Sequence, residues 1–331
     1  MKRRRSLDAQ TNAPGWRLRD FRWDDIPALV EIALLIYPDE PTTVAQYEHW
    51  ERTYPKDNPR LRYVVETDAG QVVASGACLR PFWLDTVGVY WLDGEVHPQW
   101  RRRGIGAALQ AALEPFGRAQ GATRLWTSCR EDFAHTVRFL ERGGYIRFGV
   151  RFESKLDLTT FDETPFVGAC DRARAADYEL TTLAAERAGQ PDADRQLYDL
   201  YCAILRDVPL PGGARFEQTY ENFRSFHLES PDADPAGIFI AKRAGQYVGM
   251  TSVELLKNGP AITSTTGVRR EHRGQGLAMA LKLTSFRFLR ERGYSEARSH
   301  NDTANPPILR LNEKLGYQRL PGWLQWEKLL E

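Results

Sequence analysis

Two stretches of the sequence combine the residue types that bind a phosphate-bearing ligand. Residues 96–109 read VHPQWRRRGIGAAL, and residues 268–281, at an offset of 172 positions, read VRREHRGQGLAMAL. In each stretch an apolar extended run ends at a Val, an Arg follows five residues later, and a Gly three residues after the Arg opens a long amphipathic segment. This order predicts a strand, a tight basic turn and the N-terminus of a helix.

Such a turn suits a pyrophosphate, because the first N–H groups of a helix lack internal partners and carry the positive end of the helix dipole. Glycines let the backbone approach the anion, and arginines add charge and donors. The predicted ligand-binding residues of the first turn are Val96, Arg101, Arg102, Arg103, Gly104, Ile105, Gly106 and Ala107. Those of the second turn are Val268, Arg273, Gly274, Gln275, Gly276, Leu277 and Ala278.

The patterns Arg101-x-x-Gly104-x-Gly106 and Arg273-x-x-Gly276-x-Ala278 resemble the acetyl-CoA signature of the GNAT acyltransferase superfamily. Their doubled occurrence resembles tandem GNAT proteins, and the resemblance covers nearly the whole chain. It implies acetyl-CoA (coenzyme A) as the cofactor. It also implies an α/β (α+β) fold of two GNAT acyl-CoA N-acyltransferase domains, each a mixed, twisted sheet flanked by helices.

An internal repeat supports two domains of one fold. Residues 96–147 align with residues 268–319 without a gap, and glycines recur at three helix boundaries in both copies. A repeat of roughly 170 residues is far longer than the 20 to 50 residues of a solenoid unit. We expect a disordered basic tail at residues 1–14, an N-terminal domain at 15–160, a linker at 161–176 and a C-terminal domain at 177–331.

Hydrophobic periodicity predicts similar elements in both halves. Strand 87–96 and helix 104–120 flank the first turn, and strand 261–268 and helix 277–292 flank the second. Pro115 predicts a kink or an early stop of the first of these helices. Helices are also predicted at 134–142, 194–206, 215–227 and 308–315, a long alternating strand at 145–158, and no clear period at 159–176.

Asp93 and Glu95 are the predicted catalytic residues. Both lie on the strand before the first turn and share a face by the two-residue period of a strand. An amine that attacks a thioester directly needs no protein nucleophile, but a carboxylate can remove its proton, directly or through water. The alternative is that both acids are solvated partners of nearby arginines. The second half has Thr265 and Gly267 at the matching positions, and Glu254 is a weaker substitute.

The resemblance also implies a bulge on the strand before each turn, whose amides stabilise the oxyanion, and two further site positions. Many relatives place an Asn at the start of the last helix, against the pantetheine arm, and a Tyr seven residues later that protonates the thiolate. Asn305 matches the first position, whereas Asn312 occupies the second. The first half has Phe133 and Leu140 there. Neither half therefore shows the usual general acid.

The composition is ordinary for a soluble globular protein. The chain has 331 residues, 42% of them hydrophobic and 27% charged, and a net charge of +1, which argues against nucleic-acid or membrane binding by the whole protein. The four cysteines show no disulfide or metal pattern, and no apolar run reaches the length of a membrane span. Pairing Cys129 with His135, or grouping His97, His272 and His300, lacks supporting spacing. We expect a cytoplasmic monomer or homodimer without metal.

The predicted function is transfer of an acetyl group from acetyl-CoA to a primary amine of a small molecule or peptide. Two alternatives stay open. The missing tyrosines favour a non-catalytic acyl-CoA-binding or regulatory protein, while Asp93 and Glu95 count against it. A thiol-ligand acetyltransferase resembling mycothiol synthase, also a tandem GNAT protein, is the other. The acceptor is not readable, since the segments that choose it are the least patterned.

Overall fold

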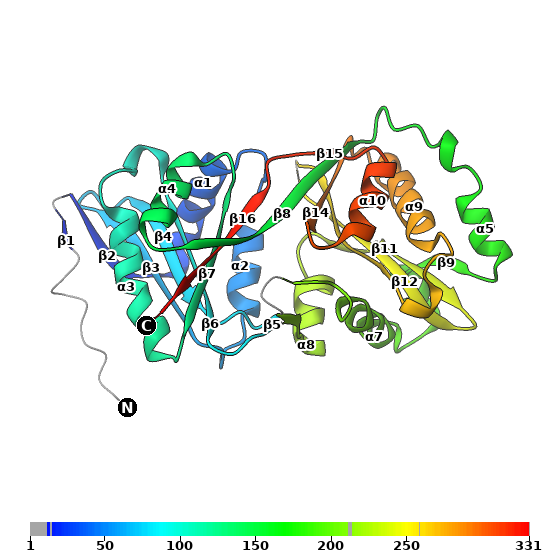
Figure 1. Cartoon of the computed structure of the whole chain (residues 1–331), viewed down its shortest axis with the longest axis horizontal. Helices are drawn as coiled ribbons and strands as arrows, with labels where there is room; N and C mark the ends of the chain where they lie inside the picture. Colours follow the sequence, from blue (N-terminus) through cyan, green and yellow to red (C-terminus); the bar gives the residue numbers. More distant parts are fainter. Residues whose placement is uncertain (1–11, 14, 211–213, 258, 331) are drawn as a thin grey trace.

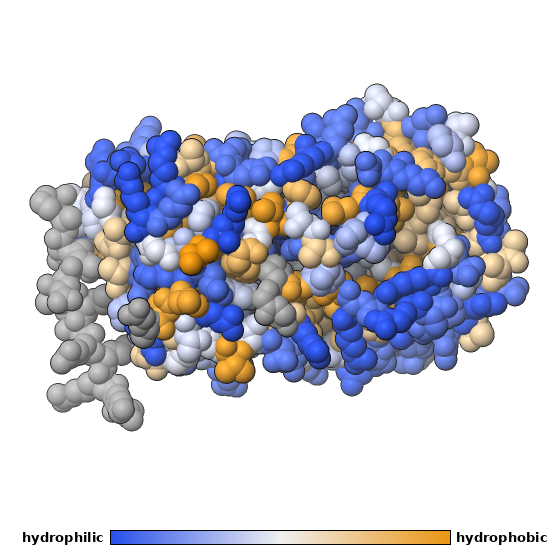
Figure 2. Space-filling view, in the orientation of Figure 1, coloured by the Kyte–Doolittle hydropathy of each residue, from blue (hydrophilic) through white to orange (hydrophobic). Residues whose placement is uncertain are grey.

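The computed structural model describes residues 12–13, 15–210, 214–257 and 259–330. Most of the predicted basic tail, residues 1–14, lies outside the described residues. The chain forms two α/β lobes side by side, the first built mainly from residues 15–160 and the second mainly from residues 177–331 (Figure 1). We call these two residue ranges the first half and the second half. On the face shown in Figure 2, hydrophilic residues cover both lobes, with hydrophobic residues scattered among them.

The first half alternates strands and helices in the predicted order. Its strands are β1 (Asn12–Ala13), β2 (Trp16–Asp20), β3 (Arg60–Thr67), β4 (Val72–Leu79), β5 (Leu84–Asp85), β6 (Val89–Val96), β7 (Arg124–Arg130) and β8 (Ile146–Asp157). Its helices are η1 (Trp23–Asp25), α1 (Ile26–Ile36), α2 (Val44–Thr53), η2 (Pro98–Trp100), α3 (Ile105–Ala119) and α4 (Ala134–Arg142). A segment with η3 (Thr164–Phe166) and α5 (Ala169–Ala175) then leads to the second half.

The second half repeats this order. Its strands are β9 (Glu179–Thr182), β10 (Arg215–Phe216), β11 (Ala233–Arg243), β12 (Gln246–Leu255), β13 (Ala261–Val268), β14 (Glu296–Asp302), β15 (Gln318–Arg319) and β16 (Trp323–Leu329). Its helices are α6 (Leu183–Gly189), α7 (Ala193–Leu205), α8 (Tyr220–Phe223), η5 (Arg224–Leu228), η6 (Arg270–His272), α9 (Leu277–Glu291) and α10 (Pro306–Lys314).

The two halves share one continuous mixed sheet. Its strand order is β1-β2-β3-β4-β6-β7-β16-β8-β14-β13-β12-β11-β9, with β15 added beside β8. Within each half the neighbours are antiparallel except at one position, where β6 pairs with β7 and β13 pairs with β14 in parallel. Along the chain, α3 lies between β6 and β7, and α9 lies between β13 and β14; these two helices follow the predicted ligand-binding turns.

The halves exchange their final strands. β16, from the end of the chain, lies between β7 and β8 in the first lobe, and β8 continues into the second lobe beside β14 (Figure 1). The two exchanged strands pair at equivalent positions. Leu329 of β16 lies opposite Arg124 of β7, and Asp157 of β8 lies opposite Glu296 of β14, so both residues of the second pair are the repeat equivalents of residues in the first pair. Each half therefore completes the sheet of the other.

Apolar side chains on both faces of this sheet form the cores. In the first half, Ile105, Leu109 and Leu113 of α3 are buried against β3, β4 and β7. In the second half, one core packs α9 against the sheet, and a separate core packs α7 and α8 against the opposite face of β11 and β12.

Most predicted elements are confirmed, with three corrections. Helix α3 continues through Pro115 to Ala119, so the predicted early stop is wrong; burial of Leu113 and Gly117 on the same helix face stabilises the continuation. Residues 215–227 are not one helix but β10, α8 and the π-helical turn η5. The segment at 159–176, which lacks a clear period, carries the short helix α5 packed on α9.

The exchange predicts that a change at the end of the chain destabilises the first lobe. Trp326 of β16 is 4% exposed and packs in the first core, so Trp326→Ala should lower the free energy of unfolding by roughly 3–5 kcal/mol. Leu329 on the same strand is 64% exposed, and Leu329→Ala should change it by less than about 0.5 kcal/mol. Chemical denaturation measures both, and hydrogen exchange should show faster exchange in β7 for the Trp326 variant alone. Equal effects of the two variants would contradict the exchange.

Candidate functional site

A gap opens between the parallel strands of each half. β6 and β7 pair only at residues 89–91 and 124–126, although both strands continue, and β13 and β14 pair only at residues 261–263 and 297–299. The amide of His97 donates to the Val73 carbonyl on β4, and the amide of Arg269 donates to the Val248 carbonyl on β12. Because amides alternate along an antiparallel strand, those of Gly94 and Val96, and of Thr266 and Val268, point into the gaps.

A bulge borders the gap in the second half. The ladder between β12 and β13 passes from the pair Ser252–Thr265 to the pair Val253–Thr263, which leaves Ser264 as the extra residue. The Ser252 hydroxyl accepts a hydrogen bond from the Thr265 amide at 3.2 Å. The ladder between β4 and β6 runs from Ala74–Val96 to Leu79–Trp91 without a shift. The family resemblance implies a bulge on both β6 and β13, and of these two strands only β13 has one.

Both predicted turns present unpaired amides to open space. Gly104 and Gly276 begin α3 and α9 with φ of +79° and +77°, and Arg102 and Gly274 occupy a matching second position with φ of +65° and +79°. In the described part of the chain, none of the amides of residues 102–107 or 274–279 donates a hydrogen bond to a backbone carbonyl outside its helix. A Cβ built at Gly104, Gly274 or Gly276 would meet no atom within 4 Å. These cradles fit a diphosphate.

The signature arginines hold the turns together. The Arg101 Nε donates to the carbonyl of Val96 at 3.2 Å, and the Arg273 Nε donates to the carbonyl of Val268 at 3.0 Å. Arg273 and Arg270 also form ion pairs with Asp207, and these arginines hold the pKa of Asp207 below its usual range. Each signature arginine thus links the strand end to the turn, and in the second turn Asp207 neutralises part of the charge of Arg270 and Arg273.

The predicted carboxylates of the first half lie together but differ in their contacts. The amide of Ala77 on β4 donates to Asp93 Oδ1 at 3.0 Å, so this carboxylate is engaged with the sheet. Burial, and then the neighbouring Asp93, raise the pKa of Glu95 to about 7. Burial, and then the charge of Glu95, raise the pKa of Tyr37 and of Tyr47. Glu95 is therefore the carboxyl of this pair with the chemistry of a base poised near neutral pH.

Aromatic rings lie beside these carboxylates. Tyr37 contacts both Phe133 and Trp323, with ring centroids 5.6 and 5.4 Å apart. Phe133 is the N-cap residue of α4, the position at which the family resemblance implies an Asn. Asn305, the N-cap residue of α10, holds that position in the second half and makes no side-chain cap hydrogen bond, so its amide is free for a ligand.

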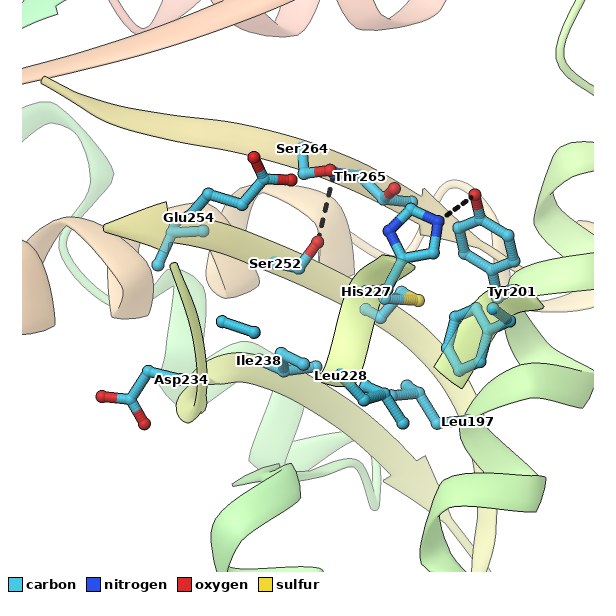
Figure 3. Close-up of a pocket in the computed structure, with 14 residues that line it drawn as sticks. Leu197, Tyr201, His227, Leu228, Asp234, Ile238, Ser252, Glu254, Ser264 and Thr265 are labelled. Carbon is cyan, nitrogen blue, oxygen red and sulfur yellow. Dashed lines mark hydrogen bonds between the residues drawn. The ribbon is translucent and has the colours of Figure 1, made fainter. Parts of the chain in front are cut away.

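The second half has a pocket on the face opposite α9 (Figure 3). Glu254 and Ser252 of β12, the bulge residues Ser264 and Thr265, and His227 and Tyr201 converge on it. Burial raises the pKa of Glu254, and the Ser264 hydroxyl opposes this shift. The Tyr201 hydroxyl lies 3.0 Å from His227 Nε2, and burial lowers the pKa of His227 to about 4, so this imidazole is neutral. The pocket has room for about one water molecule.

This pocket makes Glu254 a stronger candidate for the catalytic base than the sequence indicates. Glu254 is not at the position that matches Asp93 or Glu95, and its strand precedes the one that ends at the turn. The sequence offers it only as a carboxylate on a neighbouring strand. Its place beside Ser264 depends on the bulge, and the pocket wall depends on η5, neither of which leaves a clear signal in hydrophobic periodicity.

The described helices include none with the length and apolar composition needed to cross a membrane. The model of the acetyltransferase (GNAT) family matches residues 19–145 and 196–317. A mycothiol acetyltransferase of Thermobispora bispora is 32% identical over 231 residues, which covers 68% of this chain and 71% of the relative. A mycothiol acetyltransferase of Thermomonospora curvata is 30% identical over 225 residues, covering 68% of this chain and 69% of the relative.

Solved structures agree on the fold. A tandem GNAT protein from the clavulanic acid biosynthesis pathway superposes with a TM-score of 0.72 at 20% identity, covering 95% of this chain and 98% of that chain. A GCN5-related N-acetyltransferase from Sphaerobacter thermophilus superposes with a TM-score of 0.66 at 20% identity, covering 95% of both chains. The predictions of a tandem GNAT fold and of an acetyltransferase are confirmed: the chain belongs to the acetyltransferase (GNAT) family.

Proposed function

We propose that this acetyltransferase transfers the acetyl group of acetyl-CoA to a primary amine of a small molecule or peptide, and that the second half carries the reaction. The observation that carries this proposal is the pocket in which the Glu254 carboxyl meets the bulge of β13. The family generally uses acetyl-CoA. Acetyl-CoA bound at the second turn would supply the thioester, and Asn305 would contact its arm.

The residues of the second half have separate tasks in this proposal. The amides of residues 274–279 bind the diphosphate, and the amides of Thr266 and Val268 line the gap toward the thioester carbonyl. Glu254 accepts the proton of the attacking amine, directly or through the one water molecule for which the pocket has room. His227 and Tyr201 are neutral, so Glu254 is the charged side chain of the pocket that lies nearest the bulge.

The first half is the rival site for the same reaction. It offers Asp93 and Glu95, and its turn keeps the residues proposed for the cofactor, Val96 and 101–107. However, its gap lacks the bulge, and Tyr37, Phe133 and Trp323 pack beside its carboxylates. We propose that residues 15–160 and residues 177–331 are two GNAT domains, and that the first of them serves mainly as a scaffold.

Substitution of the candidate bases tests which half is active. Glu254→Gln should reduce turnover by about 100-fold or more, because the amide cannot take the proton. Asp93→Asn and Glu95→Gln should each stay within about 3-fold of the unchanged protein. The measurement is thiol release from acetyl-CoA across an amine panel that includes an aminosugar thiol, since the curated relatives are named mycothiol acetyltransferases. Full activity of Glu254→Gln with loss in the Glu95 variant would assign the reaction to the first half.

The pH dependence of catalysis tests the protonation state of Glu254. A base must be deprotonated, and burial raises the pKa of Glu254 above its usual value of 4.5. Activity should therefore be full at high pH and fall as the pH decreases through a midpoint above 4.5, before acid unfolding begins. The profile of kcat/KM measures this midpoint, with circular dichroism at each pH as the control for unfolding. A profile that stays flat down to pH 4.5 would exclude Glu254 as the base.

Calorimetric titration with acetyl-CoA tests the two turns separately. A methyl group at Gly276 has free space in the protein but would occupy the cradle, and the left-handed conformation adds a cost of about 1 kcal/mol. Gly276→Ala should weaken acetyl-CoA binding by about 10-fold or more. Gly104→Ala is the matched variant in the first turn and should leave the affinity of the second turn unchanged. Loss of binding in the Gly104 variant alone would contradict the proposed use of the second turn.

A further inference from the structure

Buried polar atoms without partners gather between α9 and α10 of the second half. Among the described residues, the Lys282 Nζ and both amide atoms of Asn312 have no hydrogen-bond partner, and the hydroxyls of Thr263 and Tyr317 interact with each other beside them. Lys282 is 0% exposed and Asn312 is 3% exposed. The Lys282 Nζ lies 4.7 Å from the centroid of the ring of Tyr317, which stands three residues after the end of α10. We call Thr263, Lys282, Asn312 and Tyr317 the inner polar group.

The inner polar group lies at the gap of the second half. Thr263 belongs to the last residue pair that joins β13 to β14 before these strands separate. It shares a strand face with Ala261, which packs in the core formed by α9, whereas Glu254 shares a face with Met250, which packs in the core formed by α7. The inner polar group and the Glu254 pocket therefore approach the same gap from opposite faces of the sheet.

The first half shares this polarity only in part. The repeat offset places Trp91, Gln110 and Leu140 where the second half has Thr263, Lys282 and Asn312, and Leu140 is buried in the apolar core. On the adjoining strand, Cys129 stands where the second half has Asn301, which is 7% exposed and donates to Ser299 Oγ. The first half thus has apolar side chains in place of Thr263 and Asn312, whereas Gln110 and Tyr145 are polar at the positions of Lys282 and Tyr317, and the Tyr145 hydroxyl also lacks a partner.

Keeping such atoms without partners destabilises the free protein. A buried polar group that lacks a hydrogen bond costs about 1–3 kcal/mol, and native cores satisfy nearly all of their polar atoms. Several orphaned atoms at one place indicate a ligand that supplies their partners. Burial lowers the pKa of Lys282 to about 7, so its amine carries a proton in part of the molecules at neutral pH. Tyr317 is the titratable side chain that faces it; Cys170 of α5 instead contacts Ala280 and Thr284.

We propose that Lys282 donates the proton that the departing thiolate takes up, in place of the tyrosine expected at position 312, while Asn312 positions the arm that carries the thioester. This inference rests on the proposed activity of the second half. The amine nitrogen forms a bond to the acetyl carbon, and the bond between that carbon and sulfur breaks, its electron pair remaining on sulfur. Glu254 receives the proton of the amine, and the Lys282 ammonium gives a proton to sulfur. Exchange with water restores both residues.

The test follows the ionisation of the bound coenzyme A thiol by the ultraviolet absorbance of the thiolate. With the unchanged protein, the nearby ammonium should lower the thiol pKa by at least about one unit relative to free coenzyme A. Lys282→Met should abolish this shift and reduce turnover by about 100-fold, while the KM of the amine changes by less than about 3-fold. Gln110→Met, at the matching position of α3, should leave the thiol ionisation and turnover unchanged.

Stability of the ligand-free protein gives a second readout. Because Lys282→Met removes an orphaned amine, it should raise the melting temperature, and coenzyme A should then stabilise the variant less than it stabilises the unchanged protein. Asn312→Leu, which introduces the residue of the first half, should also raise the melting temperature and weaken coenzyme A binding about 10-fold. Lys282→Gln replaces Lys282→Met if the latter does not fold.

The outcomes separate the two proposals. If the unchanged protein does not bind coenzyme A, the proposed function of the second half fails. If it binds coenzyme A but Lys282→Met and Lys282→Gln leave the thiol ionisation and turnover as they were, the role of Lys282 is wrong while the proposed function stands. Loss of turnover in both Lys282 variants together with loss of the thiol shift supports the inference.

Discussion

The reciprocal pairing of β8 and β16 is the constraint on which the other features depend. Each ligand gap needs two parallel strands that separate, and a strand that leaves one neighbour must be paired on its other edge. β7 has β16 at that edge, and β14 has β8, so each gap is braced by a strand from the other half of the chain. The backbone of the second gap thereby stays open for a ligand without an unpaired sheet edge.

On this nearly symmetrical frame the two halves have diverged in polarity. Both keep the turn with its free amides and the arginine that ties the turn to the strand end. The first half surrounds its gap with Tyr37, Phe133 and Trp323, while the second has a bulge, a carboxyl in a pocket and unpaired polar atoms. Buried polar atoms without partners and a bulge both oppose close packing, and in the second half they lie at the gap that we propose for a polar ligand.

The sequence predicts those parts of the structure that depend on residues close together in the chain. Glycines at 104 and 276 mark left-handed residues before long helices, and the repeat offset carries this signal to both halves, so the fold class and the turns could be predicted. Glu254, Lys282 and β16 are different. The surroundings of Glu254 depend on a one-residue shift between strands, and a lysine within a helix is ordinarily solvated. The position of β16 is set by pairing with residues some 200 positions away, which no local pattern encodes.

The place of β16 also bears on how the protein is made. Residues 124–130 leave the ribosome long before residues 323–329, yet the sheet of the first lobe holds the later segment between its own two strands. At the usual 5 to 20 residues per second, about 200 further residues take roughly 10 to 40 seconds to synthesise. Throughout that interval the nascent first lobe has an exposed strand edge, at which other chains can pair until β16 has been made.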